Sequence, residues 1–369
     1  MSHADFIHLR NHSGYSLLEG ALKVKDLVQR TKDHDMPAVA ITDTGNLFGA
    51  LEFSSACMIN GIQPIIGTQL EVTPFQSPAG HDGFGADRQQ GAMRVPDQIV
   101  LLAQNKIGYA NILKLVSNFH LEPDGNAEPR ISINQLKRYN DGIIAFTAGP
   151  KGGVGRLLAE GQNEAAETLL KTLKKIYGDR LYVEIQRHNL AIENQIEGPL
   201  IDLAYKNDLP LIATNECFFD TKDIFDAHDA LICISAGAYV DQSQRRRLTV
   251  DHRFKSPSEM RTLFSDLPEA IDNTLVVARR CSVMAEAREP LLPRAPKQIE
   301  NGDSSDDEVL RMLSSKGLRE RLVNQVFHDD IDEMSKVQLE NSYQERLNYE
   351  LLIISEMGFS GYFLIVADF

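Results

Sequence analysis

The sequence is poor in cysteine, with only four among 369 residues, at positions 57, 217, 233 and 281. No two of them form a Cys-x-x-Cys pair, which excludes a zinc ribbon, and their wide scatter excludes a disulfide framework. An apolar run of about 18 residues, long enough to span a bilayer, is also absent. The first residues lack the basic and then apolar layout of a signal peptide. We therefore predict a cytoplasmic protein that has no membrane partner.

Basic residues are scarce relative to acidic ones, because 38 Lys and Arg stand against 52 Asp and Glu and give a formal net charge of −14. Proteins that grip a nucleic-acid backbone replace its counterions with clustered Lys and Arg. This segment is therefore not expected to be the main contact to DNA or RNA.

The length of the chain limits the number of domains, because single hydrophobic cores stop growing at about 250–300 residues. We expect one large domain followed by a smaller one.

Short runs of β-forming residues alternate with helix-like stretches over the first two-thirds of the chain, beginning with a β-rich run at residues 6–10 and then a helical pattern at residues 23–32. This alternation predicts an α/β fold with a parallel sheet. The number of units favours a closed or nearly closed barrel, and a doubly wound open sheet is the alternative. In both folds the functional residues follow the carboxyl ends of the strands. The predicted strands are residues 6–10, 38–41, 63–72, 98–103, 142–146, 180–186 and 211–214.

Two segments interrupt this alternation. Residues 74–96 are rich in glycine and have little apolar periodicity, which predicts a surface loop between two strands. Residues 286–308 contain closely spaced prolines and then an acidic tract, which predicts a linker between domains. Helical spacing follows at residues 309–321 and 339–357, with a capping-box pattern from Ser305 to Glu308. The sequence ends in an apolar run, so we expect a second domain at residues 309–369 that is cut short.

Histidines and an arginine gather near the start of the chain. Side chains of a strand alternate between its faces, so His8, Arg10 and His12 are predicted to share a face. Two imidazoles there could begin a zinc or manganese site, but the guanidinium of Arg10 has no lone pair for a cation. The alternative is a pair of structural histidines beside a salt-bridging arginine.

Asp43 ends the next predicted strand, at the edge of the fold where functional residues are expected. An Asp before Thr-Gly-Asn is also common in turns and N-caps, which is the alternative interpretation.

Two later groups of charged residues have ordinary interpretations. Asp226 and Asp229 lie in a helical pattern and are predicted to act as N-terminal caps, which the helix dipole favours. Arg245, Arg246 and Arg247 form a short basic run that is predicted to be a solvated loop. Contact of this run with a phosphate or with a partner is the alternative.

Four ordered blocks of the sequence resemble the family of bacterial replicative DNA polymerase III alpha subunits. They are residues 8–20, residues 38–49 with the pattern Ile-Thr-Asp-x-Gly-Asn-Leu-x-Gly, residues 61–67 and residues 357–366. Together the blocks span essentially the whole chain. The resemblance implies that residues 1–285 form a polymerase and histidinol phosphatase (PHP) domain, which is a distorted (βα)7-like barrel. It also implies that residues 309–369 begin the polymerase palm domain.

In metal-binding members of this family, His, Asp and Glu side chains hold three cations that activate water against a phosphodiester. Carried over position by position, the resemblance implies that half of the ligand positions compared here have lost their ligand. The replacements are Arg10, Thr44, Gln98 and Phe218 in place of histidines and Gln69 in place of a glutamate. The positions that keep a potential ligand are His12, Glu19, Asp43, His188 and Glu216.

Several divalent cations held side by side need concentrated negative charge and deprotonated donors. The remaining residues supply too little of either, so we predict no multinuclear metal site, no cofactor bound by this chain and no phosphoesterase activity. Arg10 is instead expected to pair with Glu19, Asp43 or Glu216 through charge-assisted hydrogen bonds. Binding of one adventitious ion is the alternative.

The resemblance also implies what the longer protein does. The family transfers nucleotides to a primer end with palm carboxylates that hold two Mg²⁺ ions. The Pro-Asp-x-Asp-x-Asp-like motif of those carboxylates is absent from this sequence, so no catalytic residue is expected here. The barrel is expected to be a platform for a separate proofreading exonuclease subunit, while other holoenzyme subunits and primed DNA bind other parts. The alternatives are an active PHP metallophosphoesterase or 3'-5' exonuclease, and an interaction module without an enzymatic parent.

Overall fold

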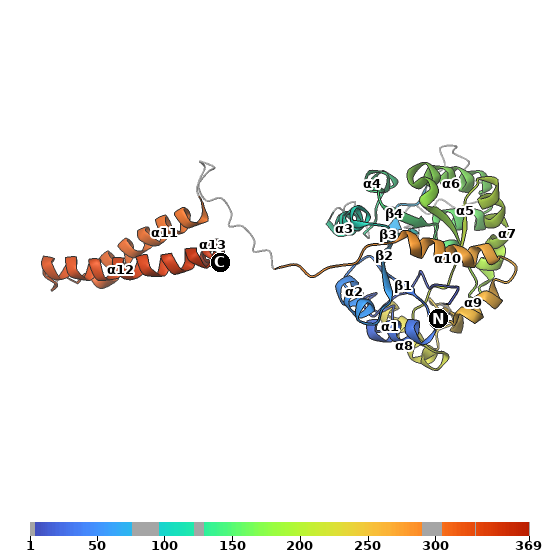
Figure 1. Cartoon of the computed structure of the whole chain (residues 1–369), viewed down its shortest axis with the longest axis horizontal. Helices are drawn as coiled ribbons and strands as arrows, with labels where there is room; N and C mark the ends of the chain where they lie inside the picture. Colours follow the sequence, from blue (N-terminus) through green and yellow to red (C-terminus); the bar gives the residue numbers. More distant parts are fainter. Residues whose placement is uncertain (1–3, 76–95, 122–128, 290–304, 329, 369) are drawn as a thin grey trace. The chain divides into compact units, whose positions relative to one another are not determined.

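The computed structural model describes residues 4–75, 96–121, 129–289, 305–328 and 330–368. The chain divides into two compact units, unit 1 (Met1–Ala287) and unit 2 (Arg288–Phe369) (Figure 1). The predicted surface loop at residues 74–96 lies almost wholly outside the described residues, because 76–95 are not among them. The same holds for residues 290–304 of the predicted linker.

A six-stranded sheet with its strands in sequence order forms the centre of unit 1. The strands are β1 (Ala38–Thr44), β2 (Gln63–Val72), β3 (Asp97–Ala103), β4 (Ile143–Phe146), β5 (Leu181–Gln186) and β6 (Leu211–Thr214). The pairs β1 and β2, β4 and β5, and β5 and β6 are parallel. β3 is antiparallel to both of its neighbours, so the prediction of a wholly parallel sheet is wrong there. Antiparallel neighbours need no crossover helix, and the described residues between β2 and β3 contain none.

The segment at residues 6–12 closes the barrel, although it is not the regular strand that we predicted at 6–10. On one side, the amide of Ala40 in β1 donates to the carbonyl of His8 at 2.9 Å. On the other side, the amide of Cys217, just after β6, donates to the carbonyl of Arg10 at 3.1 Å. Backbone hydrogen bonds to β1 and to the segment just after β6 thus join the two edges of the sheet. Unit 1 is therefore the predicted distorted α/β barrel and not a doubly wound open sheet.

Alternate residues of each strand face two different apolar layers, as a period of two requires. In β1, Val39 and Ile41 belong to the larger layer between the sheet and the surrounding helices, whereas Ala40 faces the smaller layer inside the barrel. Val277 joins the inner layer from α10, which closes the end of the barrel where the parallel strands begin. The other end, where those strands terminate, carries polar side chains.

Ten α-helices lie in the described part of unit 1 and surround the sheet (Figure 1). They are α1 (Val24–Asp33), α2 (Ala50–Ile59), α3 (Lys106–Leu121), α4 (Ile133–Arg138), α5 (Gly153–Ala159), α6 (Asn163–Tyr177), α7 (Ala191–Lys206), α8 (Phe225–Ala236), α9 (Pro257–Leu263) and α10 (Pro268–Arg280).

The described part of unit 2 is helical. It contains α11 (Asp306–Arg321), a π-helical turn η5 (Leu322–Val326), α12 (Glu333–Glu356) and α13 (Ser360–Asp368). The predicted capping box is present, because Ser305 Oγ accepts the amide of Glu308 at 3.3 Å. Within the described residues, no single helix is long and apolar enough to cross a membrane, although α12 and α13 together, bent by 112°, meet the criteria of length and composition.

Candidate functional site: the charged cluster at the carboxyl end of the barrel

Arg10 lies at the end of the barrel where the parallel strands terminate, and 0% of it is exposed. Its Nη1 donates to Oε2 of Glu184 at 3.0 Å, and its Nη2 donates to Oε1 of Glu216 at 2.9 Å. Nη2 also donates to the amide oxygen of Gln69. These partners come from β5, from the segment after β6 and from β2. One buried cation thus joins three parts of the barrel, and we call the group the Arg10 cluster.

Of the three partners predicted for Arg10, only Glu216 forms an ion pair with it in the described part of the chain. Glu19 and Asp43 have other partners. Glu184 was not among the predicted partners, because the sequence analysis treats residues 180–186 only as a strand. A signal for it was present, since a carboxylate inside a buried strand costs free energy unless it is paired.

The carboxylate of Glu216 accepts hydrogen bonds from two cationic side chains. Besides Arg10, the Nζ of Lys151 donates to Oε2 of Glu216 at 2.7 Å. The Nε2 of His12 lies 3.3 Å from Oε1. Burial alone would raise the pKa of Glu216, but the charges of Arg10 and Lys151 outweigh burial and lower the pKa well below its usual value. Glu216 is therefore ionised near neutral pH. Lys151, in the turn between β4 and α5, was missed by the sequence analysis.

Asp43 holds the turn that follows residues 6–12. Its Oδ1 accepts the amide of Ser13 and the hydroxyl of Ser16, both at 2.7 Å. Its Oδ2 accepts the hydroxyl of Ser13 at 2.8 Å. Both oxygens are thus engaged by the turn at residues 13–16, which is distant in sequence and is not the Asp-Thr-Gly-Asn turn that the sequence suggested, and Asp43 does not pair with Arg10.

Thr44 and Glu19 form a second polar group beside the Arg10 cluster. The hydroxyl of Thr44 donates to Oε2 of Glu19 at 2.8 Å, and Arg246 pairs with Oε1. Burial would raise the pKa of Glu19, but the charges of Arg246 and His12 and the hydrogen bonds from Arg246 and Thr44 together outweigh burial and lower the pKa below its usual value. Glu19 is therefore held by a side-chain cation from a distant loop.

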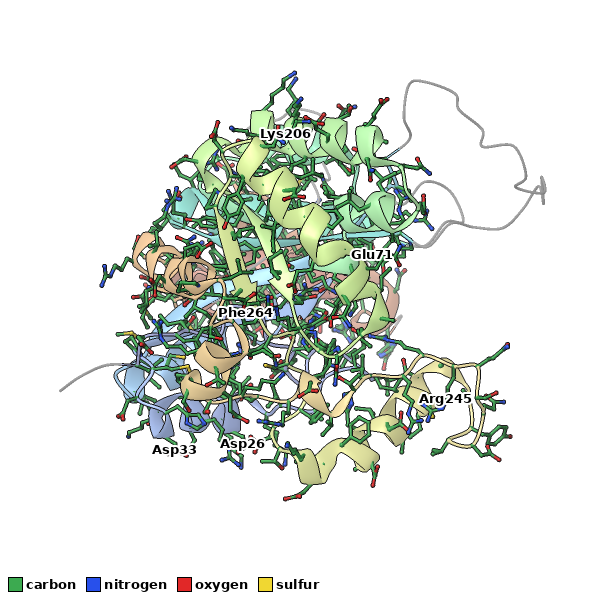
Figure 2. All side chains as sticks on the ribbon, turned by 90° about the vertical axis from the view of Figure 1, so that its right-hand side faces the viewer. Asp26, Asp33, Glu71, Lys206, Arg245 and Phe264 are labelled. Carbon is green, nitrogen blue, oxygen red and sulfur yellow. The ribbon has the colours of Figure 1, made fainter. Side chains whose placement is uncertain are left out.

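The prediction of a solvated loop is confirmed for Arg246 and Arg247, which are exposed, but it is wrong for Arg245. Arg245 lies on the loop that follows α8 (Figure 2). Its side chain is 3% exposed and donates hydrogen bonds of 2.7 and 2.6 Å to the carboxylate of Asp229. Asp229 therefore lies inside α8 as a salt-bridge partner, and its predicted role as a cap is wrong. Asp226 lies in the first turn of α8, where the dipole favours it, but no side chain caps this helix. Sequence spacing could not show that the loop folds back on the helix before it.

His12 and His188 lie beside the cluster, and both imidazoles are engaged. The His12 ring stacks on Phe218, with centroids 4.3 Å apart and planes inclined by 3°. His188 accepts the amide of Glu216 at Nε2, at 3.1 Å, and its Nδ1 donates to Glu193 at 2.7 Å. Burial lowers the pKa of His188 to about 3. The ring is therefore neutral, and both of its nitrogens are occupied.

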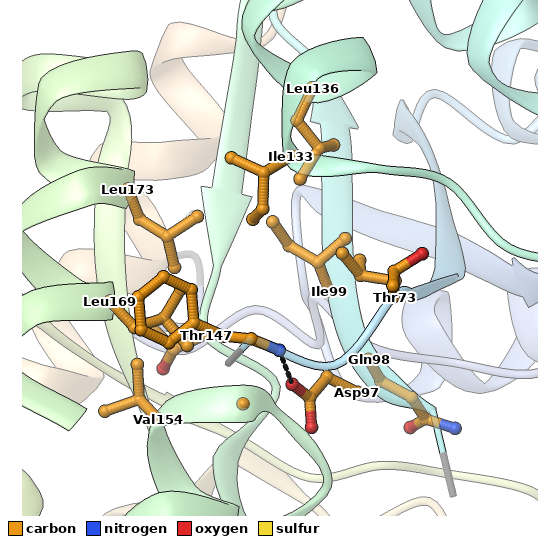
Figure 3. Close-up of a pocket in the computed structure, with 13 residues that line it drawn as sticks. Thr73, Asp97, Gln98, Ile99, Ile133, Leu136, Thr147, Val154, Leu169 and Leu173 are labelled. Carbon is orange, nitrogen blue, oxygen red and sulfur yellow. Dashed lines mark hydrogen bonds between the residues drawn. The ribbon is translucent and has the colours of Figure 1, made fainter. Parts of the chain in front are cut away.

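Two predicted positions lie away from the Arg10 cluster. The Nε2 of His8 is 2.7 Å from the carbonyl oxygen of Lys255, because residues 6–12 do not keep the regular alternation of a strand. His8 therefore does not share a face with Arg10 as predicted. Gln98 lies at the start of β3, and its amide oxygen has no hydrogen-bond partner among the described residues. With Asp97 it borders a narrow crevice that is otherwise mostly apolar (Figure 3).

The donor set does not fit a divalent metal centre. Arg10 brings a positive charge to a position where the resemblance expects a ligand. The oxygens of Glu216 are held by cations, those of Asp43 by a turn, and the nitrogens of His188 by hydrogen bonds. Among the described residues, no group of three or more His, Cys, Asp or Glu side chains is arranged to hold a metal ion.

Two known families match the chain. The family described as "PHP domain" matches residues 8–188. The family described as "Bacterial DNA polymerase III alpha NTPase domain" matches residues 308–369. The first match falls in unit 1 and the second in unit 2.

Individual relatives match nearly the whole chain. The DNA polymerase III subunit alpha of Caulobacter vibrioides is 42% identical over 99% of this chain and 30% of that protein. The subunit of the same name from Rickettsia prowazekii is 39% identical over 99% of this chain and 29% of that protein. The chain thus spans about 30% of the length of these curated relatives. Among solved structures, an amidohydrolase from Chromobacterium violaceum covers 61% of this chain and 96% of its own, with a TM-score of 0.38 and 14% identity, which is too low to support an argument.

Proposed function

This chain belongs to the family of bacterial DNA polymerase III alpha subunits, and we propose that it is the N-terminal part of the catalytic subunit of a replicative holoenzyme. In this proposal the longer protein carries out template-directed DNA synthesis in the cytoplasm. Palm carboxylates outside this chain hold its Mg²⁺ ions, and residues 309–369 begin that palm domain. Primed DNA and other holoenzyme subunits bind parts of the longer protein outside this chain, since a net charge of −14 disfavours binding of the DNA phosphates by this segment.

Primer extension tests this assignment. We expect the full-length protein to extend a primed template with deoxynucleoside triphosphates and Mg²⁺, and the 369-residue chain not to do so. A full-length protein that cannot extend the primer would favour the interaction module without an enzymatic parent. Extension by the 369-residue chain alone would contradict the placement of the catalytic carboxylates.

We further propose that ion pairs hold the barrel end together in place of metal ions, so that unit 1 has no phosphoesterase activity. The observation that carries this proposal is the burial of Arg10 between Glu184 and Glu216. A divalent cation approaching Glu216 would meet the charges of Arg10 and Lys151, which lie 2.9 and 2.7 Å from its oxygens. Repulsion between like charges at such distances is strong away from bulk water.

An assay of phosphodiester hydrolysis distinguishes this proposal from the alternative of an active PHP metallophosphoesterase or 3'-5' exonuclease. Our proposal predicts no hydrolysis of bis(p-nitrophenyl) phosphate or of a labelled single-stranded oligonucleotide when Mn²⁺ or Zn²⁺ is added. The variant Glu216→Gln is the matched control, because it removes a retained potential ligand and leaves any contaminating nuclease unchanged. Metal-dependent turnover that disappears in Glu216→Gln would favour the alternative.

We also propose that unit 1 is a docking platform for a separate proofreading exonuclease subunit. A barrel without nuclease chemistry cannot remove misincorporated nucleotides, so this task needs another protein. The described surface of unit 1 carries several exposed large apolar side chains, as an interaction surface would. We expect the full-length protein to retain the purified exonuclease in a pull-down and to lose it when residues 1–287 are deleted. A complex that survives this deletion would contradict the proposal.

A further inference from the structure

Helices α3 and α4 lie beside each other at one edge of unit 1 (Figure 1). Acidic residues make up 52 of the 369 residues of the chain, yet residues 98–121 and 129–140, which contain both helices, have none. Asp141 follows directly, and the acids of residues 122–128 lie outside the described residues. The described surface of these two helices is therefore more basic than the net charge of −14 indicates.

Four exposed cations lie on this surface, namely Lys106 and Lys114 on α3 and Lys137 and Arg138 on α4. Among the residues that the structure describes, none of the four forms an ion pair with a carboxylate. Arginines elsewhere on unit 1, such as Arg261, do form such pairs. The four charges are therefore available to an anionic ligand. We call this surface the α3–α4 basic face.

An aromatic ring lies among these cations. Tyr139, at the end of α4, is partly buried. The centroid of its ring is 5.7 Å from Nζ of Lys114 and 5.3 Å from Cζ of Arg138. Proteins that bind single-stranded nucleic acid combine cations, which contact the phosphates, with aromatic and guanidinium groups, on which bases stack. The α3–α4 basic face contains both kinds of group.

The small extent of the face favours a single strand over a duplex. Lys106 and Lys114 belong to one helix, and their positions in the sequence correspond to about 12 Å along its axis. Four cations over such a distance can contact a few phosphates, whereas proteins that bind duplex DNA tightly make roughly 6–10 phosphate contacts. The proposed function places primed DNA on the longer protein, and the unpaired template of that DNA is a single strand.

We propose that the α3–α4 basic face binds single-stranded DNA as an auxiliary contact. The choice of DNA rests on the polymerase function proposed above, whereas the face itself is defined by this chain. Lys114, Lys137 and Arg138 contact phosphates, and Tyr139 supports the stacking of a base. The net charge of −14 keeps the contact weak and dependent on salt, so the main DNA contacts stay outside this chain.

Binding of a fluorescein-labelled oligo(dT) of about 12 nucleotides to the 369-residue chain tests this inference by fluorescence anisotropy. The variant Lys114→Gln/Lys137→Gln/Arg138→Gln removes three charges from the face. At about 50 mM salt we expect this variant to bind at least about tenfold more weakly than the wild type. The slope of log affinity against log salt should also fall by about 2, since each phosphate contact to a single strand contributes about 0.7.

The matched control is Lys23→Gln/Lys25→Gln/Lys32→Gln, which removes the same charge from exposed positions at α1. We expect this control to change the affinity less than about twofold. All substituted positions are exposed, so both variants should fold, and circular dichroism checks this.

Each other outcome overturns the inference in a recognisable way. Equal losses in both variants would mean that the oligonucleotide responds to the overall charge of the chain. Absence of binding by the wild type would remove the site, and equal or tighter binding of a duplex or of oligo(U) would remove the preference for single-stranded DNA. Binding of polyglutamate in place of oligo(dT), abolished in the face variant, would assign the face to an acidic polypeptide. Primer extension by the full-length protein tests the polymerase function separately, because it depends on palm carboxylates outside this chain.

Discussion

Arg10 draws together carboxylates from separate parts of the barrel, which is the structural task of a metal ion in a metal-binding barrel. It cannot perform the chemical task, because a guanidinium has no open coordination position at which to activate water. Buried ion pairs are not automatically stabilising, since desolvation offsets much of their attraction. The cost of breaking one is much larger, because removal of one partner leaves an uncompensated buried charge.

Arg10→Ala should therefore lower the free energy of unfolding of unit 1 by about 3–5 kcal/mol, because Glu184 and Glu216 would stay buried without their common cation. Arg10→Lys should cost less, since it keeps the charge and loses only the branched geometry. Urea denaturation followed by circular dichroism measures both. The control is Lys171→Ala, which removes an exposed ion pair with Glu167 on α6 and should cost at most about 1 kcal/mol. If Arg10→Ala costs no more than the control, the ion-pair account of the barrel end is wrong.

Three buried histidines should make unit 1 sensitive to acid. Burial lowers the pKa of His8 and of His188 to about 3 and the pKa of His252 to about 2. In the unfolded chain an imidazole titrates near a pKa of about 6.5. Between these values the unfolded state binds more protons, so the stabilisation by neutral imidazoles is present above about pH 6.5 and is lost as the pH falls.

The expected loss is about 3 kcal/mol of unfolding free energy between pH 6.5 and pH 5.5, summed over the three imidazoles. Glu19 and Glu216, whose pKa values are lowered in the folded state, add to the loss only below about pH 4.3, where unfolded glutamate becomes protonated. Urea denaturation at the two pH values measures the difference. Equal stability at both would show that these imidazoles are not held neutral by burial.

Residue identities alone revealed which ligand positions had changed, because Arg10, Thr44 and Phe218 are visibly not metal ligands. They could not reveal what Arg10 binds. Its partner Glu184 is 174 residues away in the sequence, and a carboxylate in a buried strand indicates that a partner is needed but not which one. Arg246 was likewise seen as part of a basic run, and its pairing with Glu19 depends on the path of a loop. The differences from the family pattern can thus be seen in the sequence, whereas the contacts that the substituted side chains make cannot.

The strands were largely predictable, because each is a short run of buried apolar residues that matches a predicted run in position. The direction of β3 was not predictable. Local sequence favours an extended backbone, but the direction of a strand is set by the connection before it and by the sheet it joins. The prediction of a regular strand at residues 6–10 failed for a related reason. The backbone hydrogen bonds of residues 6–12 go to both edges of the sheet, and a regular strand pattern does not describe this arrangement.

The packing of α3 gives a prediction for one glycine. A Cβ on Gly108 would lie 1.8 Å from the carbonyl oxygen of Gly142, just before β4. Gly108→Ala should therefore destabilise unit 1 by about 2–3 kcal/mol, since α3 must move away, even though alanine favours helix by about 1 kcal/mol. Ile107→Ala, at the exposed neighbouring position, is the control and should change stability by less than about 1 kcal/mol. Thermal unfolding compares the two, and a neutral or stabilising Gly108→Ala would refute the close contact.

The two units differ in how much apolar surface they bury. Unit 1 has two extensive apolar layers, whereas the described part of unit 2 has a small core around Leu310, Leu351 and Leu364. We expect two transitions in urea, with the helices of unit 2 lost first, and only the later transition in a chain of residues 1–287. A single transition of the 369-residue chain would show that the units unfold together.

At the level of the whole chain, four sequence blocks were sufficient to indicate the family, because such blocks at such spacing are specific in combination. The same blocks could not establish whether the barrel end works with metals, since that depends on contacts between side chains from distant segments. In the structure Arg10 and Lys151 share Glu216, Arg10 also pairs with Glu184, and a separate pair joins Arg246 to Glu19.

The metal content of the purified protein tests this account most directly. The 369-residue chain should be produced in medium containing zinc and manganese, purified without chelator and analysed by inductively coupled plasma mass spectrometry. We expect well below one ion of either metal per chain, because Arg10 and Lys151 already neutralise the carboxylates. Two or more ions per chain, lost in Glu216→Gln, would contradict the account.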